Sequence, residues 1–158
     1  MKSIYLAGGC FWGIEEYFRR KHGIIKTEVG YANGNIENPS YQQVCSGIAS
    51  HAETVLLNYD PEIISLQSIL DKFFLIMDPT QWMRQGFDVG TQYRNGIYYL
   101  DEADLPIINA AMEKAFQRIG KSLVTEVKPL ENYYPAEEYH QQYLVKNPGG
   151  YCHVDMGK

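Results

Sequence analysis

The sequence lacks long apolar runs, and it lacks an excess of basic residues. No stretch is long and apolar enough to span a bilayer, which argues against a membrane-embedded protein. The 14 Lys and Arg are outnumbered by 19 Asp and Glu, giving a net charge of -5. A nucleic-acid partner would require a basic face, so we expect none. Too few residues precede Cys10 for a secretory leader, and we expect a cytoplasmic protein.

Cysteine is scarce, with only Cys10, Cys45 and Cys152 in the chain. An odd number of cysteines without a C-x-x-C pair excludes a disulfide scaffold and a zinc knuckle. A metal-binding module built from Cys45, Cys152 and His153 is an alternative, but its spacing matches no zinc pattern. We expect no bound metal, and we expect the thiols to serve catalysis or redox exchange, or simply to be buried.

Repeats, low-complexity tracts and linkers are absent, and 158 residues can bury a sizeable core. We predict a single domain over residues 1–158. Periodicity predicts strands at 3–7, 24–31, 54–59, 96–100 and 123–127. Helices are expected from residue 10 to about 21, from 66 after the cap Ser65, at 105–119 behind Asp104, and at 135–144, with one helical turn at 41–45. Residues 80–92 read as a long loop. The order predicts an α/β (α+β) two-layer sandwich, with a ferredoxin-like split βαβ core, a mixed sheet, extra helices and long loops.

Residues 7–13, AGGCFWG, follow an apolar run and precede the apolar-periodic residues 14–18. This pattern is typical of a strand, a tight glycine turn and the first turn of a helix. Cys10 would lie at the positive end of the helix dipole, which predicts a lowered pKa and a nucleophilic thiol. Phe11 and Trp12 would form an apolar seat beside the sulfur. The alternative is a buried cysteine with two core aromatics.

Residues 8–13, GGCFWG, resemble the active-site motif of the A-type peptide methionine sulfoxide reductases. Four further segments match in the same order: 29–34 (VGYANG), 51–53 (HAE), 85–94 (QGFDVGTQYR), and 134–137 (YPAE) leading to 139–141 (YHQ). Together they span nearly the whole chain. Phe87 stands where the family commonly has Asn, and Asn95 where it commonly has Ser. These departures lie at the predicted pocket rim and bear on substrate preference.

The resemblance implies reduction of free and protein-bound methionine (S)-S-oxide to methionine. Cys10 would take the oxygen as a sulfenic acid, the reversible first stage of cysteine oxidation. Cys152 lies in a glycine-rich tail, where the family often carries its recycling cysteine, and would form a disulfide with Cys10. Thioredoxin, or dithiothreitol in vitro, would reduce this disulfide, so no bound cofactor is expected. Cys45 has apolar neighbours and is expected to be a buried structural thiol.

Four polar residues are assigned to the site through their place in the matching motifs. Glu53 would protonate the departing oxygen, because partial burial near a thiol raises a carboxyl pKa. Without the motif, a surface glutamate would be the simpler interpretation. Tyr31 and Tyr93 would donate hydrogen bonds to the oxygen. Asp88 would help to hold the site together, although an Asx-type turn is its alternative.

A thiol peroxidase or a cysteine hydrolase is the competing enzymatic interpretation of Cys10. Either would use a histidine as base. The four histidines, His22, His51, His140 and His153, offer no obvious partner from the sequence alone. Product analysis with a methyl sulfoxide against peroxide or ester substrates would separate these activities.

Overall fold

The computed structural model describes residues 1–158, and six of its strands form one sheet in the order β7-β6-β1-β3-β2-β8. The longer elements are β1 (Lys2–Gly8), α1 (Phe11–Arg19), β2 (Ile24–Ala32), α2 (Tyr41–Cys45), β3 (Ala52–Tyr59), α3 (Leu66–Ile76), β6 (Asn95–Tyr99) and α4 (Leu105–Ile119). The shorter elements are β4 (Arg84–Gln85), β5 (Asp88–Val89), β7 (Glu126–Pro129), β8 (Tyr133–Pro135) and α5 (Tyr143–Lys146), with 3-10 turns at Thr91–Tyr93, Glu102–Asp104 and Glu138–His140.

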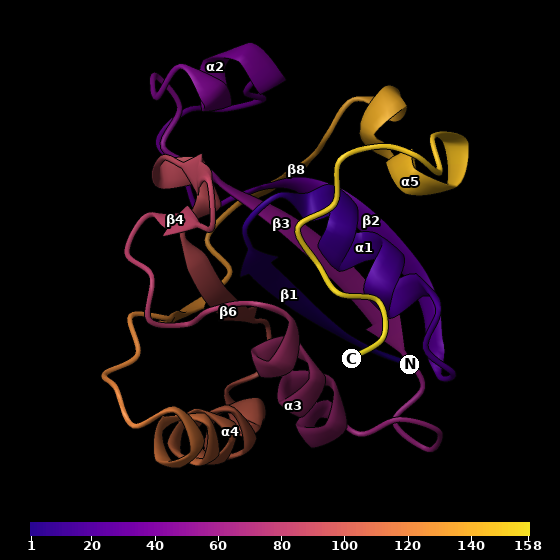
Figure 1. The fold of residues 1–158 in the computed structure, drawn as a ribbon, viewed down its shortest axis with the longest axis vertical. Coiled ribbons are helices and arrows are strands. Elements are labelled where there is room, and N and C mark those ends of the chain that lie inside the picture. The colour runs from indigo at the N-terminus through magenta and orange to yellow at the C-terminus, as the bar shows by residue number, and fades with distance from the viewer.

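The centre of the sheet has the predicted split βαβ topology (Figure 1). The units β1-α1-β2 and β3-α3-β6 interleave, so the central strands lie in the order β6-β1-β3-β2, and each neighbouring pair is antiparallel. At one edge β7 is added parallel to β6, and at the other β8 is added antiparallel to β2. The predicted mixed sheet with a ferredoxin-like core is confirmed.

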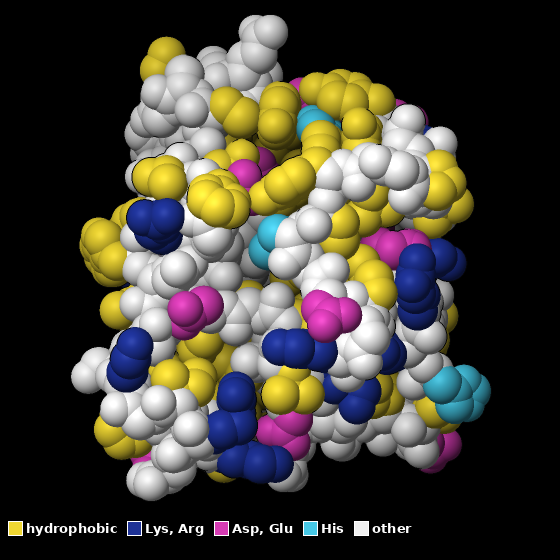
Figure 2. Space-filling model, viewed as in Figure 1, with side chains coloured by type: hydrophobic (Ala, Val, Ile, Leu, Met, Phe, Trp, Pro, Cys, Tyr) yellow, Lys and Arg dark blue, Asp and Glu magenta, His cyan; other side chains and the backbone are white.

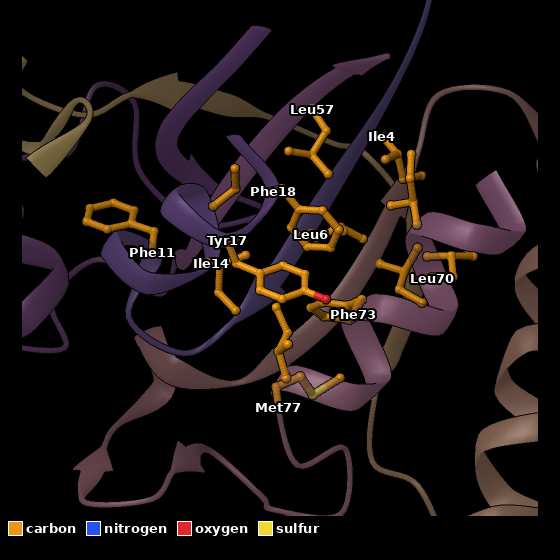
Figure 3. Packing of buried hydrophobic residues seen from close by; sticks show 14 of the residues in the cluster. Ile4, Leu6, Phe11, Ile14, Tyr17, Phe18, Leu57, Leu70, Phe73 and Met77 are labelled. Carbon is orange, nitrogen blue, oxygen red and sulfur yellow. The ribbon is translucent and has the colours of Figure 1, made fainter. Parts of the chain in front are cut away.

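The main core lies between the sheet and the helices α1 and α3 (Figure 3). Ile4 and Leu6 alternate along β1 and point to this side, where they meet Phe18 of α1 and Phe73 of α3. All four side chains are fully buried. The alternate residues of β1 face the opposite side, where Ala7 belongs to a small second cluster. The two-residue period of a strand therefore explains how one short segment serves both faces.

The prediction of a helix at residues 135–144 is wrong. Pro135 is the last residue of β8 and pairs with Gly30, which an edge strand allows because no partner needs the missing proline N–H. A 3-10 turn and the short helix α5 follow. Gln142 separates them with a φ of 50°, a left-handed conformation that interrupts a helix.

Three smaller expectations also change. Residues 80–92 are not a plain loop, since they contain the hairpin β4–β5. The last predicted strand begins at Glu126 rather than at residue 123. Asp104 makes no cap hydrogen bond, and its carboxylate instead accepts from Lys2 Nζ at 2.7 Å.

None of the helices is long and apolar enough to cross a membrane.

Candidate functional site

Cys10 lies between the end of β1 and the start of α1, as the glycine motif predicts. Gly9 has a φ of +92°, and a Cβ there would lie 2.8 Å from the Gln85 side chain. Both the backbone conformation and the lack of space therefore require glycine. Cys10 is the N-cap residue of α1, and it is only 8% exposed. The turn thus places the sulfur at a helix N-terminus inside the protein rather than on its surface.

The predicted lowering of the Cys10 pKa is wrong. Burial raises the pKa of the thiol well above its ordinary value, and the negative charge on Glu53 acts in the same direction. The nearby Trp12 amide lowers the pKa of Cys10 without overcoming this rise. Desolvation of a thiolate at this depth exceeds what one helix terminus supplies. The resting thiol is consequently neutral.

Glu53 projects from β3, where it pairs in register with Tyr31 of β2. It is 1% exposed, and its Oε1 accepts the Phe11 amide at 3.2 Å. Its Oε2 is buried and has no hydrogen-bond partner. Burial raises the pKa of Glu53 to about 8, although the Phe11 hydrogen bond lowers it and the charge of Asp88 adds to the rise. At neutral pH the carboxyl therefore holds a proton near Cys10.

Two half-buried phenols face this carboxyl. Burial and then the charges of Glu53 and Cys10 raise the pKa of Tyr93, which lies in the turn that follows β5. Burial also raises the pKa of Tyr41, and the neighbouring Cys45 and the charge of Glu53 add to this rise. Tyr41 was not expected at the site, because nothing in the sequence distinguishes it among 13 tyrosines. Only the fold shows that the first residue of α2 faces β3.

Tyr31 is buried beneath this group, and its hydroxyl is already engaged. It donates to Glu137 Oε1 at 2.7 Å, while Glu137 Oε2 accepts the Tyr41 amide at 3.0 Å. A phenol has one proton to give, so the Tyr31 hydroxyl has none left for a ligand. Its contact holds Glu137 and, through it, the start of α2.

Aromatic rings wall the other side of Cys10. Trp12 stacks on Tyr143 at 3.8 Å with an interplanar angle of 8°, and its Nε1 donates to His140 Nδ1 at 3.0 Å. The His140 ring lies 5.2 Å from Phe11 and 4.4 Å from Tyr41. Figure 2 shows hydrophobic side chains gathered between α2 and α5, with a histidine among them. Phe11 and Trp12, the residues expected to seat the methyl group, therefore belong to a larger cluster of aromatic rings.

The C-terminal tail, residues 150–158, runs back across α1 (Figure 1). Tyr151 donates its hydroxyl to Asp88 Oδ2 at 2.7 Å, which links the tail to the β4–β5 hairpin. Cys152 Sγ donates to the Val154 carbonyl at 3.4 Å. A Cβ on Gly13 would lie 3.1 Å from that sulfur. Cys152 therefore rests on the first turn of α1, close to the turn that carries Cys10.

Cys45 is exposed, so the expectation of a buried structural thiol is wrong. It is the last residue of α2, and only Val44 is buried in that helix. The apolar neighbours seen in the sequence belong to a short helix with one buried side, and Cys45 lies on the other.

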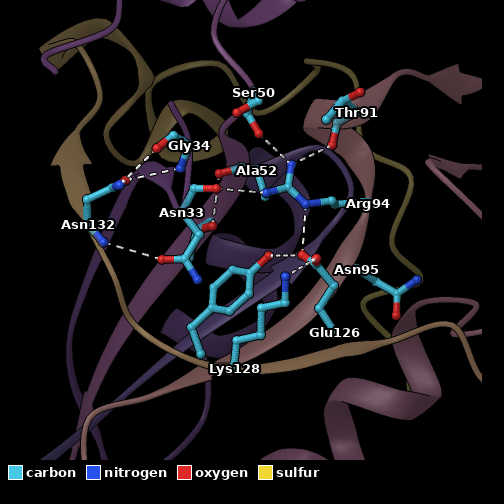
Figure 4. Close-up of polar contacts among 12 residues, drawn as sticks. Asn33, Gly34, Ser50, Ala52, Thr91, Arg94, Asn95, Glu126, Lys128 and Asn132 are labelled. Atoms are coloured by element: carbon cyan, nitrogen blue, oxygen red, sulfur yellow. Dashed lines mark hydrogen bonds and ion pairs between the residues drawn. The ribbon is translucent and has the colours of Figure 1, made fainter. Parts of the chain in front are cut away.

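Arg94 ties together the loops around the site (Figure 4). It is 8% exposed, and its Nε donates to Glu126 Oε1 at 2.8 Å. Its Nη1 donates to the carbonyls of Ser50 and Thr91, and its Nη2 to that of Asn33. These loops precede β3, contain Tyr93 and follow β2. The motif match included Arg94, but only the structure shows this positioning role.

The competing chemistries find little support in the geometry. The hydrogen bonds of His140 and His153 go to Trp12 and Gly8, and no histidine is bonded to Cys10. No group of three or more His, Cys, Asp or Glu side chains is arranged to hold a metal ion. The site instead holds a neutral thiol and a protonated carboxyl close together.

Comparison with known proteins identifies the family of this chain. The family model for peptide methionine sulfoxide reductase matches residues 2–158. The peptide methionine sulfoxide reductase MsrA of Clostridium botulinum strain Loch Maree is 58% identical over 156 residues, covering 99% of each chain.

Solved structures are also similar. The reduced form of Saccharomyces cerevisiae Mxr1 superimposes with a TM-score of 0.91 at 43% identity, covering 96% of this chain and 88% of that one. Mxr1 in complex with Trx2 gives a TM-score of 0.64 at 30% identity, covering 90% and 84%. The chain therefore belongs to the peptide methionine sulfoxide reductase family, and it is an oxidoreductase that acts on methionine sulfoxide.

Proposed function

We propose that the chain, acting as one catalytic domain, reduces the S epimer of methionine sulfoxide, both free and within proteins. Cys10 is the nucleophile and Glu53 is the acid. The observation that carries this assignment is the buried Glu53 carboxyl, which holds its proton at neutral pH and whose second oxygen has no partner. A neutral acid beside a thiol is what the departing oxygen of a sulfoxide requires.

The first step can be written so that every atom is accounted for. Cys10 Sγ attacks the sulfoxide sulfur, and the S–O oxygen receives the proton of Glu53. The thiol proton of Cys10 passes to the Glu53 carboxylate, which restores the acid. The hydroxyl then moves from the substrate sulfur to Cys10 Sγ as the S–S bond between the two sulfurs breaks. Methionine departs, and Cys10 is left as a sulfenic acid, oxidised by two electrons.

The remaining side chains bind and orient the substrate. Tyr93 donates a hydrogen bond to the sulfoxide oxygen, and Tyr41 faces the same carboxyl and is a second donor. Tyr31 acts through Glu137 to hold Tyr41 in place. Phe11 and Trp12 receive the methyl group, because their rings form part of the apolar wall beside the sulfur.

The second step regenerates the enzyme. Cys152 attacks the sulfenic sulfur, water departs, and a Cys10–Cys152 disulfide forms. Asp88 holds the tail through Tyr151, which keeps Cys152 near the catalytic turn. Thioredoxin then reduces the disulfide, a step supported by the Mxr1 complex with Trx2, and dithiothreitol replaces it in vitro. No bound cofactor is needed, and three free thiols fit a reducing compartment such as the cytoplasm.

The test is an assay with separated methionine sulfoxide epimers and dithiothreitol as reductant. We expect turnover of the S epimer, free and in a peptide, and none of the R epimer. Comparable turnover of both epimers would contradict the proposal.

A further inference from the structure

His153 is the next residue after Cys152, and its ring has a fixed orientation. Its Nε2 lies 2.9 Å from the Gly8 carbonyl oxygen. A carbonyl can only accept, so Nε2 carries the hydrogen and donates it. In the neutral ring Nδ1 is then the basic nitrogen with a free lone pair. That Nδ1 is buried and has no hydrogen-bond partner.

The free lone pair of His153 and the thiol of Cys152 face the same notch of α1. A Cβ on Gly13 would lie 3.1 Å from Cys152 Sγ and 3.4 Å from His153 Nδ1. Because Gly13 has no side chain, both atoms can pack closely against it, together with Val154 Cγ2, which would lie 3.0 Å from the same Cβ. The Cys152 thiol currently donates a hydrogen bond to the Val154 carbonyl, which is not basic enough to remove the proton.

We infer that His153 Nδ1 is the base that accepts the thiol proton of Cys152 during disulfide formation. This inference rests on the proposed recycling role of Cys152. In the step, the Cys152 sulfur forms an S–S bond with Cys10, and the S–O bond of the sulfenic acid breaks. The proton passes from Cys152 to His153 and then to the departing hydroxide, which leaves as water. The two electrons that reduce the sulfenic sulfur come from the Cys152 thiol, so no other reductant is involved.

The surroundings keep His153 neutral, so its Nδ1 lone pair is free to accept a proton. Burial lowers the pKa of His153, against smaller opposing effects of the Gly8 hydrogen bond and the charge of Asp88. Besides Asp88, the titratable and charged groups near the ring are its neighbour Cys152, and Asp78, Arg118 and Lys158 in the hollow that it also lines. A free thiol is only a few per cent ionised at pH 7, so a neutral imidazole beside Cys152 would accelerate its attack.

The test compares His153→Gln with wild type during a single turnover without reductant. A glutamine amide can still donate to Gly8, but it cannot accept a proton. A fixed concentration of dimedone competes with Cys152 for the sulfenic acid. The ratio of trapped Cys10 to disulfide then reports the disulfide-forming step, whatever the rate of the first step. His22→Gln is the matched control, because His22 is an exposed histidine outside the site.

At pH 7 we expect the ratio of trapped Cys10 to disulfide to rise at least about tenfold in His153→Gln, a modest loss for a general base. The difference from wild type should shrink above about pH 8.5, where thiols ionise unaided. In His153→Ala, added imidazole should lower the ratio toward the wild-type value. His22→Gln should match wild type throughout.

Two results would overturn the inference. One is an unchanged ratio in His153→Gln from pH 6 to 9, and the other is no effect of imidazole on His153→Ala. Both differ from a failure of the proposed function, in which wild type itself would form no methionine or no Cys10–Cys152 disulfide.

Discussion

Glu53 accepts the Phe11 amide through Oε1 at 3.2 Å, while its Oε2 is buried with no partner. One oxygen is therefore fixed to the helix that starts beside Cys10, and the other is available to a ligand. The pKa of about 8 means that the available oxygen can carry the acidic proton at pH 7. The Phe11 contact thus orients the carboxyl, which at neutral pH is a protonated acid and not a buried charge.

Replacing Glu53 by Gln should slow the first chemical step by ~10²–10⁴-fold, the usual contribution of general acid catalysis. The amide retains the shape and one acceptor, but it cannot deliver a proton. Substrate binding should change much less. Rapid-quench measurement of methionine in a single turnover checks this, and a rate near that of wild type would remove Glu53 from the acid role.

The difference in unfolding free energy between wild type and Glu53→Gln should depend on pH. The pKa of Glu53 is about 8 in the folded chain, raised from 4.5, so the folded state retains a proton that the unfolded state releases. The stability associated with this carboxyl is complete below pH 4.5 and declines as the pH rises toward 8. Urea unfolding at pH 8 should therefore find Glu53→Gln more stable than at pH 4, relative to wild type. A difference that does not grow with pH would contradict the raised pKa.

Gly13→Ala should disturb recycling and spare the first turnover. Its Cβ would lie 3.0 Å from Val154 Cγ2 and 3.1 Å from Cys152 Sγ, so the tail must move. The hydrogen bond between Glu53 and the Phe11 amide does not involve these tail atoms, so it should remain. We expect normal methionine formation in one turnover and a several-fold loss of thioredoxin-dependent turnover. Equal loss of both would show that the substitution acts on the helix rather than on the tail.

Cys152→Ser should form one mole of methionine per mole of enzyme and then stop when thioredoxin is the reductant. Dithiothreitol, being small, should restore part of the turnover. Cys45→Ser is the matched control, since Cys45 is exposed at the end of α2, and it should turn over normally. Mapping of the oxidised wild type should find a Cys10–Cys152 bond. A Cys10–Cys45 bond instead would show that the other thiol recycles the enzyme.

The sequence could predict what depends on neighbouring residues. Apolar spacing located α3, and Gly8, Gly9 and Cys10 located the turn between β1 and α1, because periodicity and glycine conformation are local properties. The interleaved strand order followed from the order of these elements. The prediction of a helix at 135–144 failed because Pro135 pairs with β2 at the edge of the sheet. That pairing joins residues far apart in the sequence, which local patterns do not show.

The site shows the same limit. The choice between Tyr31 and Tyr41 depends on which hydroxyl meets Glu137, a residue about a hundred positions away in the chain. The Cys10 pKa depends on burial and on the charges of Glu53 and Asp88, which are distant from it in the sequence. The proximity of His153 to Gly8 joins the two ends of the chain and leaves no local signal.

The most direct test of the account is the reduction of separated methionine sulfoxide epimers by wild type and Cys10→Ser, with dithiothreitol present. A serine hydroxyl is a poor nucleophile toward sulfur without an activating base. The account predicts that wild type reduces the S epimer only, and that Cys10→Ser reduces neither. Reduction of the S epimer by Cys10→Ser, or comparable reduction of both epimers by wild type, would contradict it.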